Sequence, residues 1–114
     1  MLSAAVRKIA AVLAMTAGAT LLAASPASAA QQCADLHGPE GGTVTLCKSW
    51  VWDGNDYDGK WWTDGPSSLP SHTYLQRSED GSVRNSSFSG SYSDVKKIAF
   101  RLCDSSTGRC SGWW

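Results

Sequence analysis

Thr43-Val44-Thr45-Leu46-Cys47-Lys48-Ser49-Trp50-Val51-Trp52 is the stretch that decides the fold, because it has both the composition and the period of a β-strand. β-Branched and aromatic residues predominate in it, as they do in strands generally. The apolar side chains alternate, so one face would carry Val44, Leu46, Trp50 and Trp52. Lys48 interrupts that face, and we expect it near a sheet edge or with its ammonium group extended to solvent.

A cysteine upstream of this strand predicts its first partner. Gly38-Pro39-Glu40-Gly41-Gly42 is a turn signal. Cys33 and Cys47 lie seven residues on either side of Glu40. Antiparallel strands bring such symmetric residues opposite each other, close enough for a disulfide bond. We therefore predict a Cys33–Cys47 disulfide that joins the two strands of a hairpin.

The same reasoning applies near the end of the sequence. Ser105-Ser106-Thr107-Gly108 is a second turn signal, and Cys103 and Cys110 are placed symmetrically about it. We predict a Cys103–Cys110 disulfide across this turn. In the chain-entropy description, a disulfide that closes a loop this short stabilises a fold by roughly 2–3 kcal/mol.

Other segments also have strand character. Residues 73–78 and 82–88 flank Glu79-Asp80-Gly81, a hairpin turn with a glycine available for the positive-φ position. Residues 95–103 alternate again, and Trp61-Trp62 would form another short strand. No helical period is evident after residue 29. Six or seven short strands predict an all-β domain, either a small antiparallel β-sandwich or a barrel with two hairpin disulfides.

Residues 1–29 have the pattern of a cleaved signal peptide. Arg7 and Lys8 precede an apolar run, and the small residues Ala27-Ser28-Ala29 predict cleavage after Ala29. The run is interrupted and falls short of the roughly 20 apolar residues that a membrane span needs. We therefore expect a secreted protein, with residues 30–114 as a single β domain and no membrane anchor after cleavage.

Several function classes have little support. Residues 30–114 carry eight basic and ten acidic side chains, a net charge of −2, with no basic patch for nucleic acid. Four cysteines without a CxxC pattern favour disulfides over zinc in an exported chain. HExxH and GxSxG motifs are absent, and His37 and His72 stand alone. We therefore expect no enzyme activity and no cofactor.

Aromatic residues are the unusual feature of this sequence. All six Trp, three Tyr and two Phe follow residue 29. We expect Trp50, Trp52 and Phe100 to help fill the core of a small sheet. Trp61 and Trp62 are adjacent, so in a strand they face opposite ways and one of them must lie outside the core. The candidate partner-binding residues are Trp50, Trp52, Tyr57, Trp61, Trp62 and Trp113.

The segment Asp53-Gly54-Asn55-Asp56-Tyr57-Asp58-Gly59 raises the question of a calcium site, because Ca²⁺ binds several oxygens of a tight loop. Its candidate ligands would be Asp53, Asn55, Asp56 and Asp58. The segment departs from the EF-hand pattern, since an aspartate stands where that loop requires glycine. Asn, Asp and Gly also form turns readily. We therefore predict a polar loop without a metal ion.

Ser49-Trp50-Val51-Trp52 resembles the exposed Trp-containing turn of the proteinaceous α-amylase inhibitors, which are small secreted β-sandwich proteins of streptomycetes. The resemblance covers these four residues and the size class. Val51 replaces the arginine of the inhibitors, and the cysteine spacing also differs. The resemblance implies a domain with two disulfides whose turn enters an enzyme's cleft. In general plan the chain is also similar to the adaptor subunits of secreted actinobacterial toxin particles.

Two functions follow from these observations. The first is a non-catalytic protein-interaction module with an extracellular protein partner, either a subunit of a secreted assembly or an enzyme inhibitor. The second is a carbohydrate- or cell-wall-binding module that uses a Trp platform. A sugar platform needs coplanar rings on one exposed face, whereas a protein contact needs clustered rings rimmed by polar groups.

Overall fold

A computed structural model describes residues 29–114 of the chain. The signal peptide predicted for residues 1–29 lies outside the described residues, apart from Ala29. The described part contains seven strands and no helix that is long and apolar enough to cross a membrane. The strands are β2 (Ala30–His37), β3 (Thr43–Trp52), β4 (Tyr57–Thr63), β5 (Thr73–Glu79), β6 (Ser82–Ser86), β7 (Gly90–Val95) and β8 (Ile98–Asp104).

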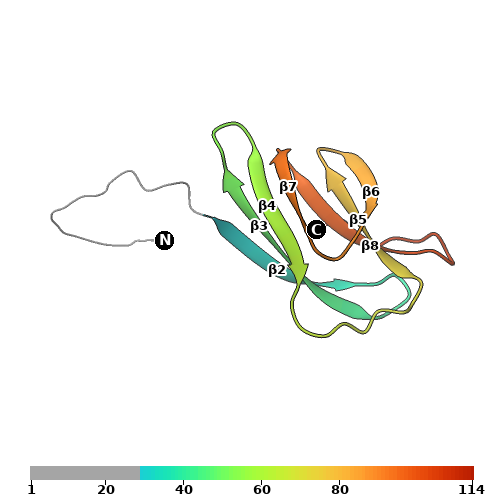
Figure 1. Ribbon diagram of the computed structural model, residues 1–114. Coiled ribbons are helices and arrows are strands. Elements are labelled where there is room, and N and C mark those ends of the chain that lie inside the picture. The colour runs from blue at the N-terminus through green and yellow to red at the C-terminus, as the bar shows by residue number, and fades with distance from the viewer. Residues whose placement is uncertain (1–28) are drawn as a thin grey trace.

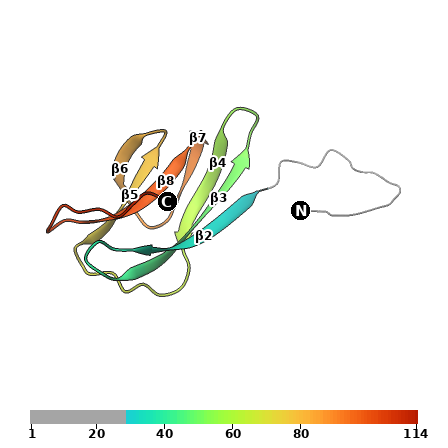
Figure 2. The same cartoon turned by 180° about the vertical axis from the view of Figure 1, so that it is seen from behind.

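The strands form two antiparallel sheets (Figures 1 and 2). The large sheet has the order β2-β3-β4-β7, and the small sheet has the order β6-β5-β8. Figure 1 shows the large sheet beside the small one, with the C-terminus lying between them. The all-β fold with six or seven short strands and two disulfides is therefore confirmed.

Both disulfides form as the turn symmetry predicts. Cys33 lies opposite Cys47 in the β2–β3 register and is bonded to it. Cys103, in β8, lies opposite Cys110 in an isolated antiparallel bridge and is bonded to it. The local turns set these registers, because a short antiparallel connection fixes which residues face each other.

The predicted strand 43–52 coincides with β3, but the predicted strand 95–103 is wrong at its start. Val95 is the last residue of β7, and the chain turns at Lys96 and Lys97 before β8 begins at Ile98. The turn is held by Asp80, whose carboxylate accepts hydrogen bonds from the backbone amides of Lys96 and Lys97 at 2.9 and 2.8 Å. Asp80 thereby joins the β5–β6 turn to the β7–β8 turn.

The core lies between the two sheets. Its fully buried members come from β3, β5 and β8, namely Val44, Leu46, Leu75, Phe100 and Leu102.

Trp61 on β4 closes the core on the β7 side. Its ring centroid is 5.6 Å from that of Phe100, and its indole nitrogen donates to the carbonyl of Ser87 at 3.0 Å. Gly90 lies opposite Trp61, and a Cβ atom there would be only 2.5 Å from the indole ring. The absence of a side chain at Gly90 therefore makes room for Trp61.

The expectation of a core position was right for Phe100 and wrong for Trp52. Phe100 is completely buried, whereas Trp52 is 46% exposed. Along β3, burial falls from Val44 and Leu46 through the partly buried Trp50 to Trp52. Packing from the small sheet covers the first half of the inner face of β3 and leaves its last residue open to solvent.

Candidate functional site

A groove opens on the inner face of the large sheet where the coverage of β3 decreases. It has a volume of about 290 Å³ and is lined by residues of β2, β3, β4, β7, the β7–β8 turn and the start of β8. We call it the lysine–aromatic groove; its lining residues are Gln32, Lys48, Trp50, Tyr57, Tyr92, Val95, Lys96, Lys97 and Ile98.

Strand alternation places the aromatic side chains of the groove. Lys48, Trp50 and Trp52 are two residues apart along β3 and therefore share the inner face. Tyr57 begins β4 directly opposite Trp52, and the two ring centroids are 5.0 Å apart with an interplanar angle of 62°. Trp52 thus stands at the rim of the groove in edge contact with a ring that lines it.

Tyr92 forms a fixed wall of the groove. Its hydroxyl donates to the carbonyl oxygen of Ser49 at 2.7 Å. To reach it, the ring passes over Gly59, where a Cβ atom would lie 2.6 Å from the Tyr92 hydroxyl oxygen. Burial, with a smaller contribution from the charge of Asp58, raises the pKa of Tyr92 above its ordinary value. The wall is therefore a neutral hydrogen-bonded ring.

Lys48 contributes a charge without an acidic partner. The side chain is partly buried, and its ammonium nitrogen lies 4.0 Å from the ring centroid of Trp114. Burial lowers the pKa of Lys48 below its ordinary value. Among residues 29–114, no carboxylate forms an ion pair with it. The ammonium group is held by a cation–π contact alone, which stabilises by about 0.5–2 kcal/mol.

Lys96 differs from Lys48 because it has acidic neighbours. Its ammonium nitrogen donates to the carbonyl of Asn55 at 3.2 Å and lies 3.9 Å from a carboxylate oxygen of Asp56. Lys97 has no ion pair within the described part of the chain. The groove therefore carries positive charge that acidic side chains neutralise only at Lys96.

An acidic cluster lies next to Lys96 at the β3–β4 turn. Carboxylate oxygens of Asp53, Asp56 and Asp94 lie within 4.8 Å of one another. Backbone amides of Asp56 and Asn55 donate to Asp53 and lower its pKa. Desolvation and the charge of Asp53 raise the pKa of Asp56. These three carboxylates are the described side chains that could hold a metal ion.

The acidic cluster differs from the ligand set considered from the sequence. Asp58 is directed elsewhere, because its carboxylate accepts a hydrogen bond from the Asp94 amide at 3.0 Å. The side-chain amide nitrogen of Asn55 donates a long hydrogen bond to a carboxylate oxygen of Asp56 at 3.5 Å. Asp94 comes from β7, far along the chain, and only the β4–β7 pairing brings it to the cluster.

The six candidate partner-binding residues are placed on three separate surfaces and in the core. Trp50 and Tyr57 line the groove, and Trp52 stands beside it. Trp61 is 3% exposed and belongs to the core. Trp62 and Trp113 lie away from the groove.

Trp62 lies on the outer face of the large sheet. It faces Cys47 in the β3–β4 register, so it stands beside the Cys33–Cys47 disulfide. A shallow hollow next to it is lined by Val51 and Lys60, among others. Trp61 and Trp62 thus face opposite ways, as their adjacent positions in a strand require.

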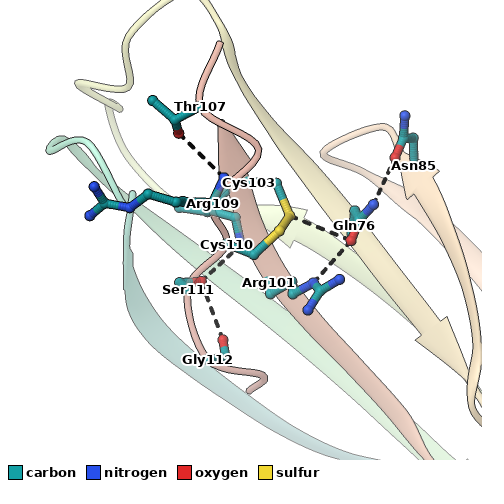
Figure 3. The surroundings of a disulfide bond; sticks show 10 residues. Gln76, Asn85, Arg101, Cys103, Thr107, Arg109, Cys110, Ser111 and Gly112 are labelled. Atoms are coloured by element: carbon teal, nitrogen blue, oxygen red, sulfur yellow. Dashed lines mark hydrogen bonds between the residues drawn. A yellow bond between two sulfur atoms is a disulfide. The ribbon is translucent and has the colours of Figure 1, made fainter. Parts of the chain in front are cut away.

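Trp113 belongs to the outer face of the small sheet. Its ring centroid lies 4.3 Å from the guanidinium carbon of Arg101. Figure 3 shows that Arg101 is also held by Gln76, whose side-chain oxygen accepts a hydrogen bond from it at 2.9 Å. The amide group of Gln76 donates to Asn85 at 3.1 Å, so these polar contacts extend across β8, β5 and β6 beside the Cys103–Cys110 disulfide.

A buried carboxylate outside the groove was missed from the sequence. Asp104 is completely buried, and the Nδ1 atom of His72 lies 2.6 Å from it. The other carboxylate oxygen accepts hydrogen bonds from the Ser106 hydroxyl and from the amides of Ser106 and Thr107. These hydrogen bonds, with a smaller contribution from His72, lower the pKa of Asp104 to about 2. Asp104 thus links the turn after β8, through Ser106 and Thr107, to His72 just before β5.

Comparisons of this chain with protein-family models, curated proteins and solved structures find no match.

Proposed function

We propose that this chain is a secreted, non-catalytic protein-interaction module. It contacts an extracellular protein through the end of the large sheet at which β3 ends and β4 begins. The contact surface consists of Trp52, Tyr57 and the lysine–aromatic groove. The partner is either another subunit of a secreted assembly or an enzyme that the module inhibits. The two disulfides fit an extracellular protein, because such bonds persist in oxidising compartments.

The observation that carries the proposal is the position of Trp52. It is 46% exposed and rests against Tyr57 at the mouth of a groove. Exposed Trp and Tyr side chains beside a pocket are typical of the few residues that dominate protein–protein affinity. The rigid sheet holds both rings in place, so little conformational entropy is lost when a partner binds.

The arrangement of the rings favours a protein over a sugar. Trp52 and Tyr57 meet at 62°, whereas a sugar platform needs coplanar rings. Trp62 and Trp113 point to other faces of the molecule, and Trp61 is buried. The exposed aromatic rings of residues 29–114 thus do not form the flat row that a sugar platform needs, and only Trp52 stands against a second ring at the groove.

A capture experiment with a matched control tests the proposal. The affinity-tagged exported protein is incubated with culture supernatant of the producing organism, and captured proteins are identified by mass spectrometry. We expect Trp52→Ala to lose a partner that the unaltered protein and Trp113→Ala both retain. Trp113 is a suitable control because its exposure, 42%, is close to that of Trp52. Equal capture by both variants would contradict the proposed surface, as would capture of cell-wall polysaccharide instead of protein.

A further inference from the structure

We propose that the partner segment bound in the lysine–aromatic groove presents a carboxylate to Lys48 and packs its apolar part against Trp50 and Tyr57. The partner would therefore contribute an acidic peptide segment with an apolar neighbour. This inference rests on the proposed function and narrows it to one chemical class of ligand.

The first support is the environment of Lys48. Its ammonium group has three hydrogen-bond donors, and no acceptor within residues 29–114 forms a hydrogen bond with it. Removing a charge from water is unfavourable unless a counter-charge compensates. The ring of Trp114 compensates from one side only, at 4.0 Å. A carboxylate in the groove would supply the missing counter-charge.

The second support is the charge of the whole groove. Three lysines line it, and no acidic residue does. Asp56 partly neutralises Lys96 but makes no contact with Lys48 or Lys97 among the described ion pairs. Charge complementarity therefore favours an anion at the Lys48 position and disfavours a cation.

The third support is the shape and chemistry of the walls. A volume of about 290 Å³ is just below the range for small-ligand pockets, roughly 300–1,000 Å³. It suits one or two side chains better than an extended anionic polysaccharide. Trp50 and Tyr57 offer apolar surface next to the lysines, so a ligand with adjacent apolar and anionic groups fits better than a simple anion.

Three matched probes test the inference without knowledge of the natural partner. 3-Phenylpropionate, 3-phenylpropanol and 2-phenylethylammonium share a benzene ring and differ in the polar end. Each is titrated into the ¹⁵N-labelled protein and followed by NMR. We expect the carboxylate to shift the amide signal of Lys48 and the indole signal of Trp50, with at least about tenfold stronger binding than the other two. Equal binding of the alcohol or the ammonium probe would overturn the inference.

A pair of lysine variants supplies the control. Lys48→Met keeps an unbranched apolar side chain and removes the charge, so we expect at least a tenfold loss of carboxylate affinity. The melting temperature should not fall, because a buried Met side chain avoids the cost of burying an ammonium group and this offsets the lost contact with Trp114. Lys60→Met, on the opposite face of the sheet, should change neither quantity. Unchanged affinity in Lys48→Met would overturn the inference. Stronger binding of trigalacturonate than of phenylpropionate would replace the peptide with an anionic polysaccharide.

The two proposals fail in different ways. If Trp52→Ala loses the captured partner while the carboxylate probe does not bind, the interaction surface stands and its ligand class is wrong. If the probe binds but Trp52→Ala retains its partner, the groove binds carboxylates and the proposed protein contact is elsewhere.

Discussion

Replacing Trp61 with alanine tests the packing of the core most sharply. The ring is 3% exposed, packs against Phe100 and lies 4.6 Å from the Arg77 guanidinium carbon. Large-to-small changes at such sites destabilise a fold by about 3–5 kcal/mol. A domain of this size has a total stability of roughly 4–13 kcal/mol, at about 0.05–0.15 kcal/mol per residue. We therefore expect Trp61→Ala to remove a large part of it.

The assay is thermal unfolding followed by far-UV circular dichroism. In a domain of this size, 1 kcal/mol shifts Tm by about 4–8 °C, so Trp61→Ala should lower Tm by at least about 12 °C. Trp62→Ala is the matched control from the same strand. Trp62 is only partly buried on the outer face, so its loss should cost clearly less. A larger loss in Trp62→Ala, or an unchanged Tm in Trp61→Ala, would refute the assignment of the core face.

Three further predictions concern other parts of the molecule. Gly90→Ala should destabilise the fold by roughly 1–3 kcal/mol in the same assay, because the new Cβ atom would displace the Trp61 ring; an unchanged Tm would show that the strands can shift without cost. Asp104 has a pKa of about 2 in the folded chain against an ordinary 3.8, so its contribution to stability is present above about pH 4 and is lost as the pH falls through about 2. Asp104→Asn should therefore lose less stability than the unaltered protein between about pH 4 and pH 2. An equal loss in the two proteins would mean that other groups cause the acid sensitivity. Chelator or added Ca²⁺ should leave Tm unchanged, because Lys96 already supplies a positive charge next to the acidic cluster; a Ca²⁺-dependent rise of several degrees would reveal a metal site through ligand linkage.

Local patterns were sufficient to predict much of the fold. The alternation in Thr43–Trp52 gave the bounds of β3, and the two turns gave both disulfides. These features depend on residues close in sequence, where strand period and turn length determine what faces what. The strand β7 was missed because Gly90–Val95 contains Gly and Asp, which are poor strand formers. It forms through pairing with β4, and an irregularity near Asp94, at φ 58°, interrupts its alternation.

The site was less predictable for the same physical reason. The sequence identified Trp50, Trp52 and Tyr57 as contact candidates, but their grouping with Tyr92 depends on the pairing of distant strands. Lys48 was expected near an edge or extended to solvent. It lies instead on β3, which is paired on both sides, and is partly buried against Trp114. The sequence showed only a single lysine on an apolar strand face. Its surroundings depend on Trp114, which is distant in the sequence and packs against it.

The most direct test of the central claim is the affinity of the captured partner for two tryptophan variants, measured by calorimetry. If Trp52 is an anchor of the interface, Trp52→Ala should lose at least 2 kcal/mol of binding free energy, about a thirtyfold rise in Kd. Trp113→Ala should bind within about twofold of the unaltered protein. A Kd for Trp52→Ala that matches the unaltered protein, or a larger loss in Trp113→Ala, would contradict the account.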